Sequence, residues 1–353
     1  YLSDLVAKLP TPVGMDYYAR IVHKAAFSRN MLSAAGHIAQ AAYDGLEEVE
    51  LAVRVETLLQ STMRSIADRP RIPMRKALMD FFERSLKDRQ RWAVGLPGLD
   101  SLLGGLYGGD LYVVAARTSV GKTALLLHML RHVAAQGARC QVHSLEMLPA
   151  DISMRMVAAV SGMSVSALRR WKYTDDTEAR VQAAMGEIDA LHIDFAKGGR
   201  YIEDVVSNTK ALMAAAGADI IFIDYLQLLH QRRQYGSRWE EMGDITAIIK
   251  ELAQEFDVPI IAAAQLSRQA AHRGDAVLTL DQQPRLEDLR ESGSIEQDSD
   301  VVLFIWRDKN AIPNAVHTLN LTLGKHRNGA LGTVQVQFDP FSQRFIEMGD
   351  MPR

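Results

Sequence analysis

Residues Ala116 to Thr123 read Ala-Arg-Thr-Ser-Val-Gly-Lys-Thr, and this stretch decides the fold class of the 353-residue chain. The apolar run Leu111 to Ala115 precedes it, and the helix-like run Ala124 to Leu130 follows it. A polar loop between a strand and a helix is typical of a phosphate-binding loop, where backbone N–H groups at a helix N-terminus hold a triphosphate. The residues predicted to bind the nucleotide are Ser119, Val120, Gly121, Lys122 and Thr123.

Two side chains of this loop have separate predicted roles. Lys122 is expected to reach the β and γ oxygens of the triphosphate, and the hydroxyl of Thr123 is expected to bind Mg²⁺. The loop departs from the usual pattern at Ala116, where a first glycine normally stands. A Gly-Lys-Thr tripeptide alone is weak evidence, and an ordinary surface loop is the alternative. The flanking strand and helix patterns favour the nucleotide site.

Composition excludes several classes of protein. No uninterrupted apolar segment approaches the length of a bilayer span, and no secretory leader opens the chain, so we expect an intracellular protein. The single cysteine, Cys140, excludes a disulfide framework within the chain and a multi-cysteine zinc module. The net charge of -3 gives no overall signature of nucleic-acid binding, so a polyanion would have to meet local basic clusters.

The first part of the chain is predicted to be helical. Apolar residues recur at helical spacing from Asp16 to Ala42, Asp44-Gly45 interrupts them, and a second such pattern runs to Ile66. We therefore expect a helical hairpin in residues 1–69 and, after the prolines of Arg69 to Pro73, a linker in residues 70–93. Its amphipathic stretch, Met74 to Trp92, is predicted to be a helix that packs either in a groove of a neighbouring subunit or on its own domain.

Residues 94–353 are predicted to form an α/β domain with a mainly parallel, twisted sheet. Apolar, β-branched runs alternate there with helical patterns, as in parallel sheets covered on both faces. The expected strands are Leu111 to Ala115, Gln141 to Leu145, Asp219 to Asp224, Pro259 to Ala264 and Val301 to Trp306. The chain then changes character, because Asn328-Gly329 between the runs Thr318 to Leu323 and Thr333 to Phe338 indicates an antiparallel hairpin.

Three polar residues end predicted strands, where the carboxyl edge of a parallel sheet binds ligands. Asp224 is the candidate for Mg²⁺, although Tyr225 rather than a second carboxylate follows it. Glu146 is therefore the candidate base, on a strand expected to lie beside that of the phosphate loop. Gln265 is placed to sense the γ-phosphate or its attacking water. The alternatives are a solvated glutamate that opens a helix and a polar residue that leaves a buried strand.

Four motifs that follow one another along the chain resemble those of one protein family. They are Ser144-Leu145-Glu146-Met147, Ile223-Asp224-Tyr225-Leu226-Gln227-Leu228, Asp288-Leu289-Arg290-Glu291-Ser292-Gly293-Ser294-Ile295-Glu296-Gln297-Asp298 and Lys325-His326-Arg327-Asn328-Gly329. Together they resemble the DnaB family of replicative helicases, whose phosphate loop similarly lacks the first glycine. The resemblance extends to the amino-terminal hairpin through Tyr17 to Val22 and Ala42 to Gly45. It implies a RecA-like P-loop NTPase domain behind a truncated amino-terminal collar domain and a linker helix.

The resemblance also implies an assembly and a division of labour. Members form a homohexameric ring around one DNA strand, with ATP and Mg²⁺ bound between adjacent subunits. The family's roles would make Glu146 the catalytic base, Asp224 the Mg²⁺ residue, and Lys325 and Arg327 the cations that reach the neighbour's γ-phosphate. A cation supplied in trans by a hairpin tip is worth about 10³ to 10⁵ in rate. Without the resemblance, an ordinary solvated turn is the alternative for both cations.

Two segments are candidates for contact with single-stranded DNA. The resemblance implies that Arg290, Glu291 and Gly293 line the channel, and glycine permits a close approach of backbone to phosphate. The basic stretch His230 to Trp239, which contains Arg238, follows the strand that ends in Asp224 and is the second candidate. A solvated charged face is an equal alternative for that stretch.

We hypothesise an ATP-dependent replicative DNA helicase that moves 5′ to 3′ on single-stranded DNA. The family context implies a bacterial or phage-infected cytoplasm, with a helicase loader and a separate primase as partners and no membrane. One rival is a RecA-type recombinase, which the helices ahead of the linker disfavour. A second rival is an ATP-gated DNA-binding scaffold, which the intact Glu146, Lys325 and Arg327 disfavour.

Overall fold

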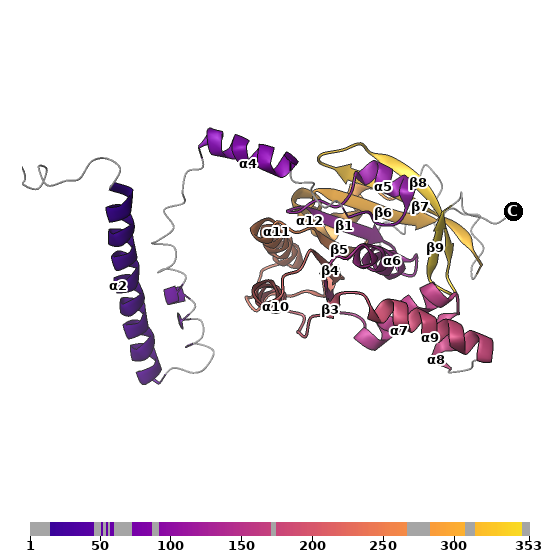
Figure 1. Ribbon diagram of the computed structural model, residues 1–353, viewed down its shortest axis with the longest axis horizontal. Helices are drawn as coiled ribbons and strands as arrows, with labels where there is room; N and C mark the ends of the chain where they lie inside the picture. The colour runs from indigo at the N-terminus through magenta and orange to yellow at the C-terminus, as the bar shows by residue number, and fades with distance from the viewer. Residues whose placement is uncertain are drawn as a thin grey trace, which may run out of the picture. The chain divides into compact units, whose positions relative to one another are not determined.

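The computed structural model describes residues 15–45, 51, 54–55, 57–59, 73–86, 92–170, 174–266, 283–307 and 315–347. The chain divides into two compact units, residues 1–88 and 89–353. Figure 1 shows the helices of the first unit and the sheet of the second, and each unit is described by itself. No helix in these ranges combines the length and the apolar character that crossing a bilayer requires.

The first unit contains α2 (Met15–Tyr43) and α4 (Met74–Leu86). The amide of Gln40 donates to Asp44 Oδ1 at 2.8 Å, just before the turn at Asp44-Gly45. Helical residues recur at 51, 54–55 and 57–59, within the predicted second arm of the hairpin. The predicted end of the linker helix is wrong, because Trp92 pairs with Leu106 in a β-bridge of the second unit. Its indole is buried there, which an exposed helix would not allow.

The second unit is built on one sheet, whose order in the described residues is β3-β2-β4-β5-β1-β6-β7-β8-β9. Neighbouring strands from β3 to β6 are parallel, and those from β6 to β9 are antiparallel. The mainly parallel sheet and the carboxy-terminal hairpin are therefore confirmed. The strands are β1 (Leu111–Ala116), β2 (Cys140–Ser144), β3 (Ile193–Phe195), β4 (Ile220–Asp224), β5 (Ile260–Gln265), β6 (Val301–Arg307), β7 (His317–His326), β8 (Gly332–Asp339) and β9 (Arg344–Glu347).

Helices cover both faces of the sheet, and alternate residues of β1 serve two cores. Tyr112 and Val114 pack with α5 and α6, whereas Leu111 and Val113 pack with α10 and α11 on the other face. A smaller cluster joins α7, α8 and α9. The helices are α5 (Pro97–Leu103), α6 (Lys122–Ala135), α7 (Pro149–Ser161), α8 (Val165–Arg169), α9 (Asp175–Asp189), α10 (Ile202–Ala215), η2 (Leu226–Leu228), α11 (Arg238–Phe256), η5 (Leu286–Ser292) and α12 (Gly293–Asp298).

The expected position of β2 is wrong. We expected this strand beside β1, but β4 and β5 lie between the two. The reason is the crossover: α6 lies across β1, β5 and β4, so the chain passes over two strand positions before it re-enters the sheet. Both strands still end at the same carboxyl edge, because the strands between them are all parallel. Glu146 therefore stays near the phosphate loop.

Two histidines, the buried His143 and the partly buried His128, make stability depend on pH. Burial lowers the pKa of His128 and His143 to about 4, which in His128 outweighs a hydrogen bond with the Gly95 carbonyl. The unfolded chain takes up these protons below about pH 6.5. Between pH 6.5 and 4 the unfolded state thus binds more protons, and the free energy of unfolding falls as the pH is lowered. The slope is at most about 1.4 kcal/mol per pH unit for each histidine.

Denaturant titrations at several pH values between 4 and 7 measure this slope. His143→Phe should lower the change in unfolding free energy per pH unit by the contribution of one histidine, because phenylalanine cannot be protonated. The matched control is His192→Gln, since His192 is an exposed residue. A slope that stays the same in His143→Phe and in the wild type would contradict the assignment.

Candidate active site

The phosphate loop joins β1 to α6 in a conformation suited to an anion. Ser119 and Gly121 have left-handed backbones with φ of 65° and 117°. No side chain caps the amino terminus of α6, which begins at Lys122 directly after Gly121. The first N–H groups of the helix therefore lack a side-chain acceptor, and the helix dipole adds positive potential there. Bound phosphate would satisfy both features.

A cavity of about 400 Å³ opens over this loop. It collects residues from the carboxyl ends of β1, β2 and β5 and from the turn between β8 and β9. The residues that line it are Ala116, Arg117, Thr118, Ser119, Gly121, Lys122, Thr123, Ala124, Glu146, Met147, Arg155, Gln265, Phe338, Pro340 and Gln343. The predicted base and sensor thus face one space with the predicted loop residues except the buried Val120, while Asp224 lies outside the lining.

Asp224 ends β4 against the first turn of α6. Its Oδ2 accepts a hydrogen bond from the Thr123 hydroxyl at 3.0 Å, and its Oδ1 lies 3.9 Å from Lys122 Nζ. Burial raises the pKa of Asp224 and lowers the pKa of Lys122, while the attraction between the two charges opposes both changes. Lys122 Nζ also lies 3.8 Å from the centre of the Tyr225 ring. The ammonium of Lys122 is therefore held between Asp224 and Tyr225, beside the phosphate loop.

The residues around Asp224 fit a divalent cation. Asp224 is only 4% exposed, and its Oδ1 has no hydrogen-bond partner in the described part of the chain. Mg²⁺ prefers oxygen ligands and keeps several of its waters. Asp224 and Thr123 offer a carboxylate and a hydroxyl beside the phosphate site, so a hydrated Mg²⁺ there would satisfy the orphan oxygen.

Glu146 is presented by a tight turn after β2. Ser144 Oγ donates to the carbonyl of Met147 at 2.6 Å, and the Leu145 amide donates to the carbonyl of Asp224 at 2.9 Å. These bonds fix the residues on either side of Glu146, whose own side chain is exposed to the cavity. A carboxylate that faces water in the triphosphate cavity is placed to act as a general base.

Gln265 contacts the phosphate loop directly. It lies opposite Ala116 in the β1–β5 ladder, and its side-chain amide donates to Thr118 Oγ1 at 3.0 Å. Thr118 of the phosphate loop is therefore the acceptor for the predicted sensor. The residues that follow, 267–282, lie outside the described part of the chain.

The cations of the β7–β8 hairpin lie far from the loop of their own subunit. His326 pairs with Val301, which pairs with Tyr112 near the start of β1. From Tyr112 to the end of β1 is about 13 Å of strand. Lys325 and Arg327 thus lie at the amino edge of the parallel strands, opposite the nucleotide cavity. They cannot act on the nucleotide of their own subunit.

Both cations have partners within the chain. Lys325 Nζ donates to the carbonyls of Glu296, Gln297 and Ser299, at the end of α12. Burial lowers its pKa. Arg327 Nη1 lies 3.1 Å from Asp300, and its side chain is 53% exposed. Lys325 is thus held by its own chain, whereas Arg327 is exposed in the turn, where an ordinary solvated turn stays the alternative to the predicted role.

The structure describes the side chains of only one of the two segments predicted to contact DNA. Residues 290–293 span the end of η5 and the start of α12, between the buried Leu289 and Ile295; the side chains of 290–294 lie outside the described residues. Arg290, Glu291 and Gly293 therefore stay predictions. The guanidinium of Arg238 binds the carbonyls of Gln227 and Leu229 and the carboxylate of Glu241. This geometry favours a structural role for Arg238 rather than a phosphate contact.

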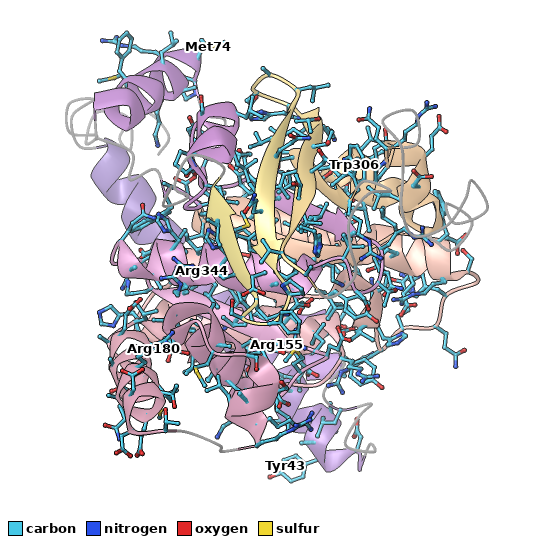
Figure 2. The ribbon with its side chains drawn as sticks, turned by 90° about the vertical axis from the view of Figure 1, so that its right-hand side faces the viewer. Tyr43, Met74, Arg155, Arg180, Trp306 and Arg344 are labelled. Carbon is cyan, nitrogen blue, oxygen red and sulfur yellow. The ribbon has the colours of Figure 1, made fainter. Side chains whose placement is uncertain are left out.

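Sequence patterns did not single out two cations of the cavity. Arg117 lies inside the phosphate loop, and its Nη1 is buried with no partner among the described residues. Arg155 on α7 lines the same cavity and, with Arg344, a smaller one of about 110 Å³ beside it; Figure 2 labels both residues. A lone arginine in a helix carries no signal in sequence. Arg117 stood inside the quoted motif, at a position without an assigned role.

Comparison with known proteins identifies the family. The model of the DnaB-like helicase C terminal domain matches residues 92–347, which include every site residue named above. The chain belongs to the DnaB family of replicative DNA helicases. A DnaB-family relative from Geobacillus stearothermophilus, named replicative DNA helicase DnaB, is 33% identical over 367 residues, covering 99% of this chain and 78% of the relative. Replicative DNA helicase DnaC of Bacillus subtilis is 31% identical, with the same coverage.

Solved structures agree with the DnaB assignment. One of them, described as an ATPase domain, superposes with a TM-score of 0.69 at 29% identity, covering 78% of this chain and 98% of that one. A DnaB-like replicative helicase, described with its interactions with primase, gives 0.75 at 26% identity and covers 98% of this chain and 82% of that one. The RecA-like fold and the use of a nucleotide are thus established for the family to which this chain belongs.

Proposed function

We propose that this chain is the motor subunit of a ring-shaped replicative helicase, which hydrolyses ATP to move 5′ to 3′ along single-stranded DNA. One observation carries the proposal: the site is divided between opposite edges of the sheet. Lys122, Glu146 and Asp224 lie at the carboxyl edge, whereas Lys325 and Arg327 lie at the amino edge. A complete site therefore needs a second copy of the chain. Repeated head to tail, such an interface closes a ring, which in this family is a hexamer.

We assign the chemistry of the nucleotide site residue by residue. Lys122 and the loop amides hold the triphosphate, and Glu146 takes the proton of the attacking water. Mg²⁺, held through Asp224 and Thr123, neutralises charge on the phosphates when bound. Arg327 of the next subunit stabilises the charge that develops in the transition state. Lys325 already has three acceptors in its own chain, so we expect it to shape the hairpin and to contribute less.

We propose that single-stranded DNA passes through the centre of the ring and contacts the segment Arg290 to Gly293. Contacts to phosphate without readout of bases suit a motor that must cross any sequence. The similar solved structure is described with its interactions with primase. We extend this by proposing a primase and a helicase loader as partners of the assembled ring, in the cytoplasm at a replication fork.

Strand displacement on forked duplexes tests the proposed function. One substrate carries a single 5′ tail and the other a single 3′ tail, with ATP and Mg²⁺ present. We expect displacement only with the 5′ tail. We expect Lys122→Ala to abolish it, because the variant lacks the ammonium group that binds the triphosphate. ATP turnover that never displaces a strand, even with a loader supplied, would argue for a recombinase or a scaffold instead.

A further inference from the structure

The side chain of Gln227 joins two strands beyond the point where their ladder stops. The β4–β5 pairing ends at Ile223 and Ala262. Gln227, in the turn after β4, then donates from Nε2 to the carbonyl of Gln265 at 3.0 Å and accepts the Gln265 amide on Oε1 at 3.1 Å. The side-chain amide of Gln227 thus takes the place of the backbone partner that Gln265 would have in a longer β4–β5 ladder. It fixes the backbone of the residue that reaches the phosphate loop.

The same turn is tied to the basic loop His230 to Trp239. Arg238 Nη2 donates to the carbonyls of Gln227 at 3.0 Å and Leu229 at 2.8 Å. Its other nitrogen pairs with Glu241, whose carboxylate also accepts the amide of Gln231 at 2.8 Å. The start and the end of the basic loop are therefore held by one guanidinium, which also holds the backbone of Gln227.

These bonds form a continuous path from the phosphate loop to the basic loop His230 to Trp239. Thr118 of the phosphate loop accepts from Gln265, whose backbone is held by Gln227, and the backbone of Gln227 is held by Arg238. A hydrogen-bond network of this kind can carry coupling between two sites, here between Thr118 and the carbonyl of Gln227 that Arg238 binds. A γ-phosphate that competes for the Gln265 amide would act at the first of these bonds.

We propose that Gln227 is a positioning residue that sets Gln265 on the phosphate loop and links its position to the basic loop His230 to Trp239. This proposal rests on the proposed function in one respect, because it takes single-stranded DNA to meet the basic loop as well as residues 290–293. The basic side chains of this loop could attract DNA phosphates, and the exposed Trp239 lies at its carboxy-terminal end. Gln227 touches neither ligand, and its effect is exerted through Gln265.

A readout without turnover tests the path itself. Trp239 is 55% exposed beside Arg238, so its fluorescence reports on the loop. Binding of a non-hydrolysable ATP analogue with Mg²⁺ should change the emission of the wild type, and Trp239→Phe should remove that change. Gln227→Met keeps the length of the side chain but loses both amide bonds. It should bind the analogue and leave Trp239 unchanged, whereas Gln335→Met on β8 should behave as the wild type.

Steady-state kinetics supply the second readout. Gln227→Met should lose about tenfold of the stimulation of kcat by single-stranded DNA, consistent with the net value of two hydrogen bonds. Its KM for ATP should stay within about twofold, because the residues that bind ATP in the ground state are unchanged. Gln265→Met should show the same loss, and the double variant should lose no more than either single one.

The outcomes separate the two proposals. A Trp239 response that is absent in the wild type, or that persists in Gln227→Met, overturns the inference. So does a double variant whose losses multiply. A wild type whose ATPase ignores DNA but whose Trp239 response depends on Gln227 overturns the assigned function and leaves the inference standing.

Discussion

Replacing Arg327 by alanine is expected to lower the ATPase rate of the assembled protein by about 10³ to 10⁵-fold, the range for an arginine finger acting in trans. Stability should hardly change, since the Arg327 side chain is 53% exposed and the buried carboxylate of Asp300 has other partners. Asp300 keeps the ammonium of Lys250 and the amide of Leu111 as partners. The loss of rate therefore reports on chemistry rather than on folding.

Subunit mixing shows whether Arg327 acts on its neighbour. Arg327→Ala subunits keep the phosphate loop, and Lys122→Ala subunits keep the arginine. In a mixed ring, some interfaces join an intact loop to an intact Arg327, so two inactive variants should regain turnover when mixed. The surface residue Arg131, paired with Glu187, is the matched control for loss of a guanidinium. No regained activity in rings shown to be mixed would contradict action in trans.

The strands and the phosphate loop were predictable because their signals are local. Every residue of β1 is buried, so its apolar run needs no knowledge of its neighbours. Loop geometry likewise follows from Gly121, which adopts the left-handed backbone that glycine tolerates. Short or half-exposed elements gave no comparable signal: β3 has three residues and β9 has four.

The arrangement of the sheet was not predictable, because it depends on contacts between distant segments. The position of β2, with two strands between it and β1, follows from where α6 crosses the sheet. Arg155 and Gln343 reach the cavity from α7 and the β8–β9 turn, which no spacing in the sequence connects to the loop. The partners of Lys325 are backbone carbonyls, which any sequence offers. The residue types indicated the chemistry, and the fold decided which of them meet.

Two carboxylates compete for the role of base, and their surroundings separate them. Asp224 is 4% exposed, has its pKa raised by burial, and accepts the Thr123 hydroxyl on Oδ2. It faces the cation site rather than the water of the cavity. Glu146 is exposed in the cavity, on a turn that Ser144 fixes. We therefore propose Glu146 as the base, and Asp224 as the residue that would hold the metal.

Glu146→Gln is accordingly expected to lower kcat by about 10² to 10⁴-fold, the usual contribution of a general base. Binding of ATP should be unchanged, because Lys122 and the loop amides remain. Asp224→Asn should instead raise the Mg²⁺ concentration needed for half-maximal binding of a fluorescent ATP analogue. Titrations of Mg²⁺ and ATP separate the two, with Glu187→Gln on α9 as the matched control. If Glu146→Gln turned over ATP at the wild-type rate, the proton would have to leave by another route, and Asp224 would be the remaining carboxylate beside the phosphates.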